Sequence, residues 1–475
     1  MELKISGPAY EVASQVANFQ KCINMFPSST GPDGRGTSCL LPTAGKKTLV
    51  ASSGKEVRAL ILFNDTIYTI IDNSFYKVTF NEDALTMTLS SVLGTLATST
   101  GPVSVARNPT QIMIVDGSTT GYVHTVSTDI FTTLDDADFT GGKMVVFMDS
   151  YFIYNTPNAA TMFTTASNNG LAISALDVIT AEGKPDKLVG LAVDKRELWA
   201  FGETGVDIYY DAANATGFPF TRREGAFIDQ GCAAAYSILN HDNTIYWLDN
   251  RGFVVRAEGY GLKVISTEAV NLAINSYRVI TDAIATSSVE YGHLFYILTF
   301  PTENKTWAYD SLTGMWHERA SFTAGDVFIR DRINCHIRYK QYEIGGDFAN
   351  GKIYLISNNY YDDAGEPIHR IRVTSHQQAE FNQIGVNTLE LALEVGKGTV
   401  TGTGSDPQIM MRYSNDSGYT WSHELTRSLG KLGEYSTRVH WNRLGTARKW
   451  LFEFRITDPI KFAILDASAD VDGGP

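Results

Sequence analysis

The sequence predicts an all-β protein that consists of a β-propeller of about six blades, a C-terminal β-sandwich-like domain and an extended N-terminal arm. Short runs of alternating aromatic and aliphatic residues, such as TIYTII and LFYILTF, are separated by turns rich in Gly, Asn and Asp. Units of this texture recur at a spacing of roughly 40–60 residues, which is typical of propeller blades. Helical periodicity is scarce by comparison.

The N-terminal arm is predicted over residues 1–46. Its central stretch, CINMFPSSTGPDGRGTSCLLPTAGKK, is rich in Gly, Pro and Ser and shows little strand pattern. We expect an extended segment that lies over the propeller or reaches toward a partner. Because such a segment packs poorly on its own, its large apolar side chains need a partner protein to bury them. These side chains are Phe19, Ile23, Met25 and Phe26.

The propeller is predicted over residues 47–365. Related units begin at Asn64, Asp242, Gly292 and Asn350, each with a polar turn, an alternating strand and a second turn. This alternation puts one face of each strand in a core and lets the other face pack against a neighbouring sheet. The repeats are too degenerate to fix the number of blades. A stack of separate sandwiches would give a similar pattern, and we favour the propeller.

One short helix is predicted within residues 267–277. Ala269, Leu272, Ala273 and Ser276 share a face there at helical spacing.

Aromatic residues make up 11% of the chain, which could suggest a stacking surface for sugars or bases. Many of them fall at strand positions, where core filling is the simpler interpretation. The residues that we assign to the core on this basis are Tyr68, Tyr246, Trp247, Phe295 and Tyr296.

The C-terminal sandwich is predicted over residues 366–475. The composition changes at the polar stretch YYDDAGEPIHR, and longer strand patterns follow it, such as NTLELALEVG and ARKWLFEFRITDP. The final stretch, DASADVDGGP, superficially resembles a calcium loop but has no glutamate at the closing position. We expect it to be a frayed acidic tail.

One motif stands out in the predicted sandwich. SNDSGYTW fits the Asp-box pattern Ser-x-Asp-x-Gly-x-Thr-Trp, which recurs in sialidase propellers and in many non-enzymatic β-proteins. We interpret it as a structural hairpin, because its residues can hydrogen-bond the turn, allow positive φ and tuck under the loop, but supply neither an acid nor a nucleophile. The residues with these roles are Ser414, Asp416, Gly418, Thr420 and Trp421.

Other catalytic and metal motifs are missing. No GxSxG, HExxH or Walker pattern occurs, and the four cysteines lie far apart without a CxxC pair. Cys335 and His336 are adjacent but lack two further ligands, so we predict neither a metal nor a cofactor. His293 and His317 are most simply satisfied polar groups of the core or turns. The sequence therefore predicts a protein that is not an enzyme.

The charge and hydropathy of the sequence argue against further classes of protein. The net charge of −13 argues against a surface that grips nucleic-acid phosphates, although DNA could pass through a channel without binding. No apolar run is long enough to span a membrane. The N-terminal residues MELKISGPAYEVASQ lack the pattern of a secretory signal, so we expect the chain to be made and kept in a cytosol.

Several blocks together resemble the packaged-DNA stabilisation proteins of short-tailed bacteriophages, also described as tail accessory or hub proteins. The blocks are ANFQKCINMFP with CLLPTAGK, then AEGKPDKLVGLAVDKRELWAFGETGVDIYYD, GFPFTRREGAFIDQGCAAAYSI, GHLFYILTFPTENKTWAYDSLTGMWHER, and finally MRYSNDSGYTW with ARKWLFEFRITDP. They span nearly the whole chain in the expected order. The chain departs from the family at Ala44, where Pro is often seen, and this affects only the local turn.

The resemblance implies a structural virion protein with a propeller fold, located in the tail and assembled in the host cytoplasm. Six copies would form a ring beneath the portal and its adaptor, continuing the tail channel and helping to retain packaged double-stranded DNA. A tail needle or distal tail or fibre proteins would attach below the ring, and no membrane would be involved. The N-terminal arm would contact a neighbouring copy or the adaptor, so that its deletion would spare folding but abolish incorporation into particles.

An alternative remains open at this stage: a virion-borne propeller that binds or cleaves host-surface carbohydrate, as a sialidase does. Such an enzyme needs an arginine cluster that clamps a substrate carboxylate and a Tyr–Glu nucleophile pair. Convergent carboxylates and arginines at the propeller axis would favour this alternative. A featureless axis would favour the structural hub.

Overall fold

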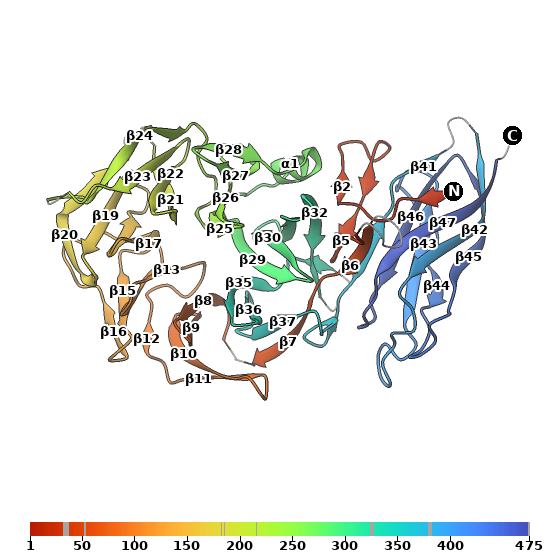
Figure 1. Cartoon of the computed structure of the whole chain (residues 1–475), viewed down its shortest axis with the longest axis horizontal. Coiled ribbons are helices and arrows are strands. Elements are labelled where there is room, and N and C mark those ends of the chain that lie inside the picture. Colours follow the sequence, from red (N-terminus) through yellow and green to blue (C-terminus); the bar gives the residue numbers. More distant parts are fainter. Residues whose placement is uncertain are drawn as a thin grey trace.

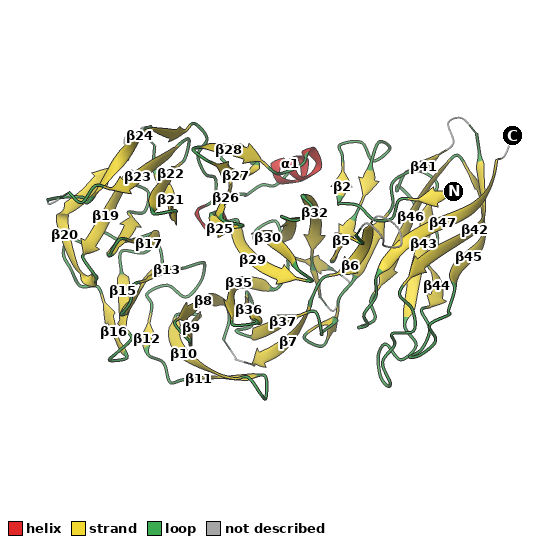
Figure 2. Ribbon diagram, in the orientation of Figure 1, coloured by secondary structure: helices red, strands yellow, loops and turns green. Residues whose placement is uncertain are grey.

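The computed structural model describes residues 1–31, 38–51, 54–181, 183–184, 186–214, 216–323, 327–378 and 382–473. A ring of small sheets occupies one side of the molecule and a two-sheet sandwich the other, with both chain ends on the sandwich (Figure 1). Strands dominate (Figure 2), and the described residues contain one α-helix, α1 (Glu268–Asn275), and one 3-10 turn, η1 (Ala235–Ser237).

The ring is a propeller whose described residues form seven blades, one more than the sequence indicated. Each blade is an antiparallel sheet of four strands. The first three blades are β8 (Val57–Phe63), β9 (Thr66–Ile71), β10 (Ser74–Asn81), β11 (Thr86–Leu89) with β12 (Gly94–Thr95) beside β10; β13 (Ser104–Arg107), β14 (Gln111–Val115), β15 (Gly121–Thr125), β16 (Ile130–Thr133); and β17 (Met144–Met148), β18 (Tyr151–Asn155), β19 (Thr161–Ala166), β20 (Asn169–Thr180).

The next three blades follow in the same order. They are β21 (Leu188–Asp194), β22 (Glu197–Gly202), β23 (Val206–Asp211), β24 (Phe220–Ile228); β25 (Leu239–His241), β26 (Thr244–Leu248), β27 (Val254–Glu258), β28 (Gly261–Val264); and β29 (Ile284–Glu290), β30 (His293–Phe300), β31 (Lys305–Asp310), β32 (Met315–Arg319). In each blade the first strand lies nearest the axis, beside the first strands of neighbouring blades.

The seventh blade closes the ring with a strand from the other end of the chain. It contains β35 (Ile333–Tyr339), β36 (Tyr342–Asp347), β37 (Ile353–Ser357) and, as its outer strand, β7 (Gly45–Val50). β37 and β7 pair antiparallel, and β38 (Asp362–Asp363) lies parallel to β7 and pairs with β39 (Glu366–Pro367). A small hairpin, β33 (Ser321–Phe322) with β34 (Phe328–Ile329), links the sixth and seventh blades.

The sandwich has two sheets, and both include N-terminal strands. One sheet runs β45 (Val439–Ala447), β42 (Ile384–Leu393), β47 (Ile464–Gly473), β6 (Ser38–Pro42), β5 (Met25–Ser29), with β1 (Glu2–Leu3) on β47. The other runs β4 (Cys22–Ile23), β40 (Arg370–Val373), β46 (Lys449–Ile456), β43 (Gln408–Ser414), β44 (Leu425–Ser428), with β41 (Gln377–Gln378) on β46. A short hairpin of β2 (Tyr10–Glu11) and β3 (Phe19–Gln20) lies beside them.

The blade hairpins follow from turn chemistry and alternation. Asp242 and Asn243 adopt φ of 47° and 60° between β25 and β26, the left-handed pair that a type I′ turn requires and that these residue types tolerate. The strand that follows is buried on both faces, since each blade packs between two others. The aromatic residues assigned to the core are confirmed there. Tyr68, Tyr246, Trp247, Phe295 and Tyr296 are each 0% exposed.

Of two local predictions, one is confirmed and one needs correction. Helix α1 forms as predicted, with Thr267 as its N-cap, and it buries Ala269, Val270 and Ile274, whereas Leu272 is exposed. The acidic C-terminal stretch is a strand rather than a frayed tail: β47 lies between β42 and β6 in the middle of a sheet, and its alanines are buried. Residues 474 and 475 lie outside the described part.

Candidate functional site

The first fifty residues join the two domains. Ile23 in β4 pairs in parallel with Glu318 of the sixth blade and antiparallel with Ile371 of the sandwich, so one sheet continues from the propeller into the sandwich. The β5–β6 hairpin extends the opposite sheet of the sandwich, and β7 completes the seventh blade (Figure 1). We call residues 1–31 and 38–50 the N-terminal segment, and its contacts with both domains the interdomain junction.

The apolar side chains of this segment are buried within the chain itself. Phe19, Ile23, Met25 and Phe26 are 6%, 7%, 1% and 0% exposed. The expectation that they need a partner protein to bury them is therefore wrong. Local sequence could not show this, because most of the residues that cover them lie about 270 to 430 positions further along the chain.

A fully buried arginine, Arg372, holds the segment to the sandwich. Arg372 donates from Nε to the carbonyl of Ile5 (2.6 Å), from Nη1 to those of Pro8 (3.0 Å) and Lys21 (3.3 Å), and from Nη2 to the Oε1 of Gln20 (2.8 Å).

Arg370, two positions earlier on β40, donates from Nη2 to the carbonyl of Tyr361 (2.7 Å). Burial lowers the pKa of Arg370 to about 10. Both arginines are 0% exposed, so their hydrogen bonds to main-chain carbonyls replace hydration. Sequence reasoning missed them, because alternating arginines on a strand ordinarily indicate a solvent face.

Asn24 adds a second link. Its side-chain Nδ2 donates to the carbonyls of Ala320 (2.8 Å) and His369 (2.9 Å), while its Oδ1 accepts from the amide of Ala320 (2.9 Å). It adopts a left-handed φ of 55°, which Asn tolerates better than most residues. A single amide side chain therefore ties the N-terminal segment to the end of the sixth blade and to the start of the sandwich.

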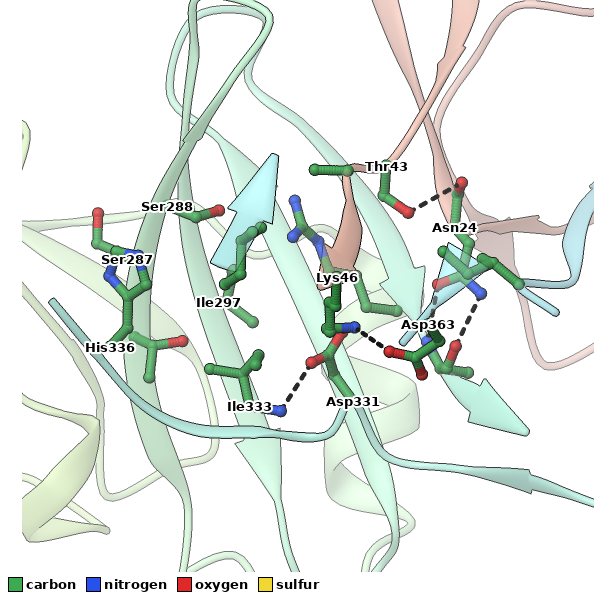
Figure 3. Close-up of a pocket in the computed structure, with 16 residues that line it drawn as sticks. Asn24, Thr43, Lys46, Ser287, Ser288, Ile297, Asp331, Ile333, His336 and Asp363 are labelled. Carbon is green, nitrogen blue, oxygen red and sulfur yellow. Dashed lines mark hydrogen bonds and ion pairs between the residues drawn. The ribbon is translucent and has the colours of Figure 1, made fainter. Parts of the chain in front are cut away.

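A buried ionic cluster lies where β7 enters the propeller (Figure 3). Lys46 Nζ lies 3.1 Å from Asp363 Oδ1 and 3.4 Å from Asp331 Oδ2. Arg332 Nε lies 3.0 Å from Asp363 Oδ2. Burial alone would lower the pKa of Lys46, but Asp331 and Asp363 raise it above its usual range. The cavity beside these groups is only about 20 Å³, room for roughly one water molecule.

A second buried ion pair faces the same cavity. Arg319 Nη1 lies 2.5 Å from Glu290 Oε1, and Glu290 Oε2 accepts from the amide of Ala44 at 2.8 Å. Burial raises the pKa of Glu290, but Arg319 and the hydrogen bonds outweigh it and hold the pKa below its usual value. His293 and His317 lie nearby and are buried. Both ring nitrogens of His293 are hydrogen-bonded, as the sequence indicated, whereas His317 accepts from Arg319 at Nε2 and its Nδ1 has no hydrogen-bond partner among the described residues.

The Asp-box forms a hydrogen-bonded turn after β43. Ser414 Oγ donates to Asp416 Oδ1 (2.7 Å) and accepts from the amide of Gly418 (2.8 Å), and Thr420 donates to Asp416 from its amide (2.8 Å) and its hydroxyl (2.6 Å). The Thr420 hydrogen bonds lower the pKa of Asp416 to about 2. Every oxygen of the carboxylate is thus occupied by its own turn.

The structure brings this turn against the N-terminal segment. A Cβ added at Gly418 would lie 3.0 Å from the ring of Phe19, and φ at Gly418 is 94°. Trp421 packs against the same cluster, which contains Phe19 and Leu451, and the guanidinium of Arg412 lies 4.9 Å above its ring. The Asp-box and the apolar residues of the N-terminal segment, which nothing in the sequence connects, therefore contact each other.

The propeller axis opens into a cavity of about 730 Å³ at the end where the innermost strands begin. We call it the axial funnel. All seven blades contribute to it, and its charged lining residues are Glu56, Lys143, Glu203, Asp282 and Arg330. This assembly is not evident from the sequence, because its residues come from all seven blades and are spread between positions 56 and 334.

Tyr236 crosses the axis below the funnel. It lies in η1 of the fifth blade, and its hydroxyl contacts the carbonyls of Pro102 (3.3 Å) and Lys143 (3.2 Å) in the second and third blades. Burial raises the pKa of Tyr236 above its usual range. Since the hydroxyl faces carbonyls rather than a carboxylate, it is not arranged as the Tyr–Glu nucleophile pair of a sialidase.

Neither a metal site nor a membrane-spanning helix is present among the described residues. Within them, no group of three or more His, Cys, Asp or Glu side chains could hold a metal ion. No helix in that part of the chain is long and apolar enough to cross a membrane. The cysteines are free, and burial raises the pKa of Cys22 to about 11 and of Cys232 to about 12, so both thiols are protonated at neutral pH.

Comparison with known protein families matches both parts of the chain. A family described as "Bacteriophage P22 Gp10, beta-propeller" matches residues 14–360, and one described as "Bacteriophage P22 Gp10, beta-sandwich" matches residues 369–472. The chain belongs to the bacteriophage P22 Gp10 family. The Gp10 family consists of stabilisation and tail accessory proteins of short-tailed phages, so this protein is a phage structural protein of the virion with a propeller and a sandwich domain.

Solved structures resemble the chain only at low similarity. The WD40 β-propeller domain of Doa1 is 10% identical, with a TM-score of 0.38, over 66% of this chain and 97% of that one. PorZ of Porphyromonas gingivalis is 10% identical, with a TM-score of 0.41, over 81% of this chain and 46% of that one. No curated protein matches the sequence. Similarity at this level says nothing about function.

Proposed function

We propose that six copies of this Gp10-family chain form a ring below the portal and its adaptor protein in a short-tailed phage. The ring continues the tail channel and helps to retain packaged double-stranded DNA, and a tail needle or distal tail or fibre proteins attach below it. The chains assemble in the host cytoplasm. The observation that carries this proposal is the family match over both domains in order.

The strand pairing between the two domains suits a virion component that must resist mechanical force. The seventh blade is closed by β7, and β4 continues a blade into the sandwich, so the two domains share strands rather than a flexible linker. A closed propeller also leaves few free strand edges, which lowers the risk of edge-to-edge aggregation. Ring formation then needs only head-to-tail contacts between rigid bodies.

The DNA channel in this proposal lies between the copies and not along the propeller axis. Tyr236 spans that axis and contacts carbonyls of two other blades, which leaves no passage for a duplex. The net charge of −13 supports a channel wall that repels phosphates, so that the genome slides during ejection. A basic wall facing the channel would contradict this point.

The test is the number of copies per purified, DNA-filled particle, measured by quantitative mass spectrometry against the portal protein. Half the portal count is expected, as for a sixfold ring on a twelvefold portal. A count in multiples of three well above that value would indicate a receptor-binding appendage. Absence from purified particles would refute a virion role altogether.

A further inference from the structure

Two strongly exposed apolar side chains lie at opposite ends of the molecule. Among the large apolar side chains of the described residues, Leu176 and Val400 are the most exposed, at 80% each. Leu176 lies on β20, at the edge of the propeller farthest from the sandwich, and Val400 lies in the sandwich between β42 and β43 (Figure 1). A single exposed apolar side chain is ordinary, so the surroundings of each decide its meaning.

Leu176 projects from a bulge at the edge of the third blade. β20 is the outer strand of that blade, and residues 174–177 of β20 stand opposite Thr164 alone on β19. The extra residues therefore bulge out of the strand. In the bulge, the amide of Ala175 donates to Oδ2 of Asp138 (3.0 Å), so the loop that precedes the third blade lies beside it.

The bulge is apolar and acidic. Leu171, earlier on β20, is exposed as well. Four carboxylates belong to the bulge and the adjoining loop, and none of them forms an ion pair within the described part of the chain; they are Asp135, Asp136, Asp138 and Asp177. We call these four residues, Leu171 and Leu176 the rim patch. Its uncompensated negative charge favours a partner that is apolar and basic.

Val400 belongs to a second patch, formed by two adjacent loops of the sandwich. The loop between β42 and β43 and the loop between β44 and β45 are hydrogen-bonded to each other. The amide of Gly396 donates to the carbonyl of Leu429 (3.0 Å), and the amide of Gly433 donates to the carbonyl of Gly396 (3.1 Å). Two further apolar side chains of the second loop, Leu432 and Tyr435, are exposed beside this contact.

The same loops carry a small excess of positive charge. Lys397 and Lys461 share one oxygen of Glu394, at 3.4 and 3.5 Å, and Lys431 forms no ion pair among the residues that the structure describes. With Glu434 included, three lysines stand against two glutamates. We call these five charged residues, together with Val400, Leu432 and Tyr435, the sandwich-loop patch.

The net charges of the two domains differ in the same sense. Residues 369–475 contain twelve basic and twelve acidic side chains, so the whole net charge of −13 belongs to residues 1–368. Two propellers placed side by side would therefore repel each other, whereas a sandwich placed against a propeller would not. A ring of identical copies needs two different, mutually complementary patches on each copy. The rim patch and the sandwich-loop patch meet this requirement.

We propose that the sandwich-loop patch of one copy docks on the rim patch of the next copy. This inference rests on the proposed function, since it names the surfaces that join neighbouring copies of the ring. Val400, Leu432 and Tyr435 cover the leucines of β20, and the lysines lie against the aspartates. The two patches lie at opposite ends of each chain, so every copy offers one free patch to each neighbour until the ring closes.

Cysteine cross-linking in purified, DNA-filled particles tests the contact. A chain with both Leu176→Cys and Val400→Cys is treated with a bismaleimide, and its products are separated by size under denaturing conditions. We expect a series of covalently linked chains, because these two positions lie too far apart within one copy to be linked to each other (Figure 1). Each single variant should stay unlinked, since the contact joins different residues. The unaltered chain controls for the native cysteines, three of which are buried.

A charge substitution tests the same contact without a reagent. Leu176→Lys places a cation opposite the lysines of the sandwich loops and should lower the number of copies per particle about tenfold or more. The melting temperature of the purified chain should not change, because the side chain is exposed. Leu312→Lys is the matched control: Leu312 is 70% exposed on the sixth blade, outside both patches, and its variant should be incorporated normally.

The copy number, measured on the same particles, separates failure of this inference from failure of the proposed ring. Where the copy number is half the portal count, three results would overturn the docking contact alone. These are the absence of linked chains, equal incorporation of Leu176→Lys and Leu312→Lys, and linkage of position 176 to a different virion protein. A copy number that does not fit the ring would refute the proposed function, and the docking contact would fall with it.

Discussion

Replacing Lys46 by Met should destabilise the protein by about 3 kcal/mol. Lys46 is 7% exposed, and its Nζ lies within 3.4 Å of both Asp331 and Asp363. Removing one partner of a buried ion pair typically costs about 3–5 kcal/mol, because the remaining charge stays buried without compensation. Arg332 still pairs with Asp363 in the variant, which places the expected loss at the lower end of that range.

The assay is equilibrium unfolding in urea, followed by the fluorescence of tryptophans such as Trp316 in the sixth blade. Lys47→Met is the matched control: this neighbour on β7 makes no ion pair among the described residues and should cost well under 1 kcal/mol. The double variant Lys46→Met, Asp331→Asn should lose less than the sum of its single variants. Equal losses for Lys46→Met and Lys47→Met would refute the reasoning.

Three further predictions concern the same junction. Phe19→Ala should lower the free energy of unfolding, measured in urea, by about 3–5 kcal/mol, because the ring is buried within the chain. An unchanged unfolding midpoint would show that the N-terminal segment is dispensable for folding. Arg372→Met should remove the donor from the carbonyls of Ile5 and Pro8 and speed amide hydrogen exchange over residues 5–21, whereas exchange equal to that of the unaltered chain would contradict the anchoring role. Arg319 lowers the pKa of Glu290, so the stability that ionised Glu290 contributes is present above its ordinary pKa of 4.5 and is lost as the pH falls below that value. In a plot of the urea unfolding midpoint against pH, Glu290→Gln should therefore reduce the fall of the midpoint at acid pH. An identical fall in the variant and the unaltered chain would disprove the assignment.

Most of the propeller was predictable because its signal is local. A hairpin such as that around Asp242 and Asn243 carries its turn residues and its alternating strands within about fifteen positions. The number of blades was not predictable. The closing strand β7 pairs with β37, about three hundred residues away, and no local pattern reports such a pairing.

The sandwich strand β47 was missed for a different reason. Ala467 and Ala469 face the core and the intervening polar residues face outward, which is a period-two pattern. Ala and Asp have low strand propensity, so the pattern was interpreted as a tail. The strand forms because β42 and β6 flank it and bury its alanines.

The two candidate sites also differ in how much the sequence reveals. The Asp-box is contiguous, and its turn is evident from Ser414 to Trp421 alone. The axial funnel is not, because Asp282 and Arg330 belong to different blades and are ordinary residues in their local context. Only the circular arrangement of the blades brings them to one cavity.

The pairing of early strands with late ones has a consequence for biosynthesis. Glu2 pairs with Ser468, and Val50 pairs with Ile353. The strands that are synthesised first therefore have no pairing partner until the later part of the chain has been synthesised. While a ribosome is still translating the second half of the chain, β7 has not yet met its partner β37 in the seventh blade, and the sandwich lacks its central strand β47. Pairing over such separations is slow, and the waiting strands present open edges to other nascent chains. Translation that stalls before the sandwich is complete should therefore yield aggregates rather than a folded propeller.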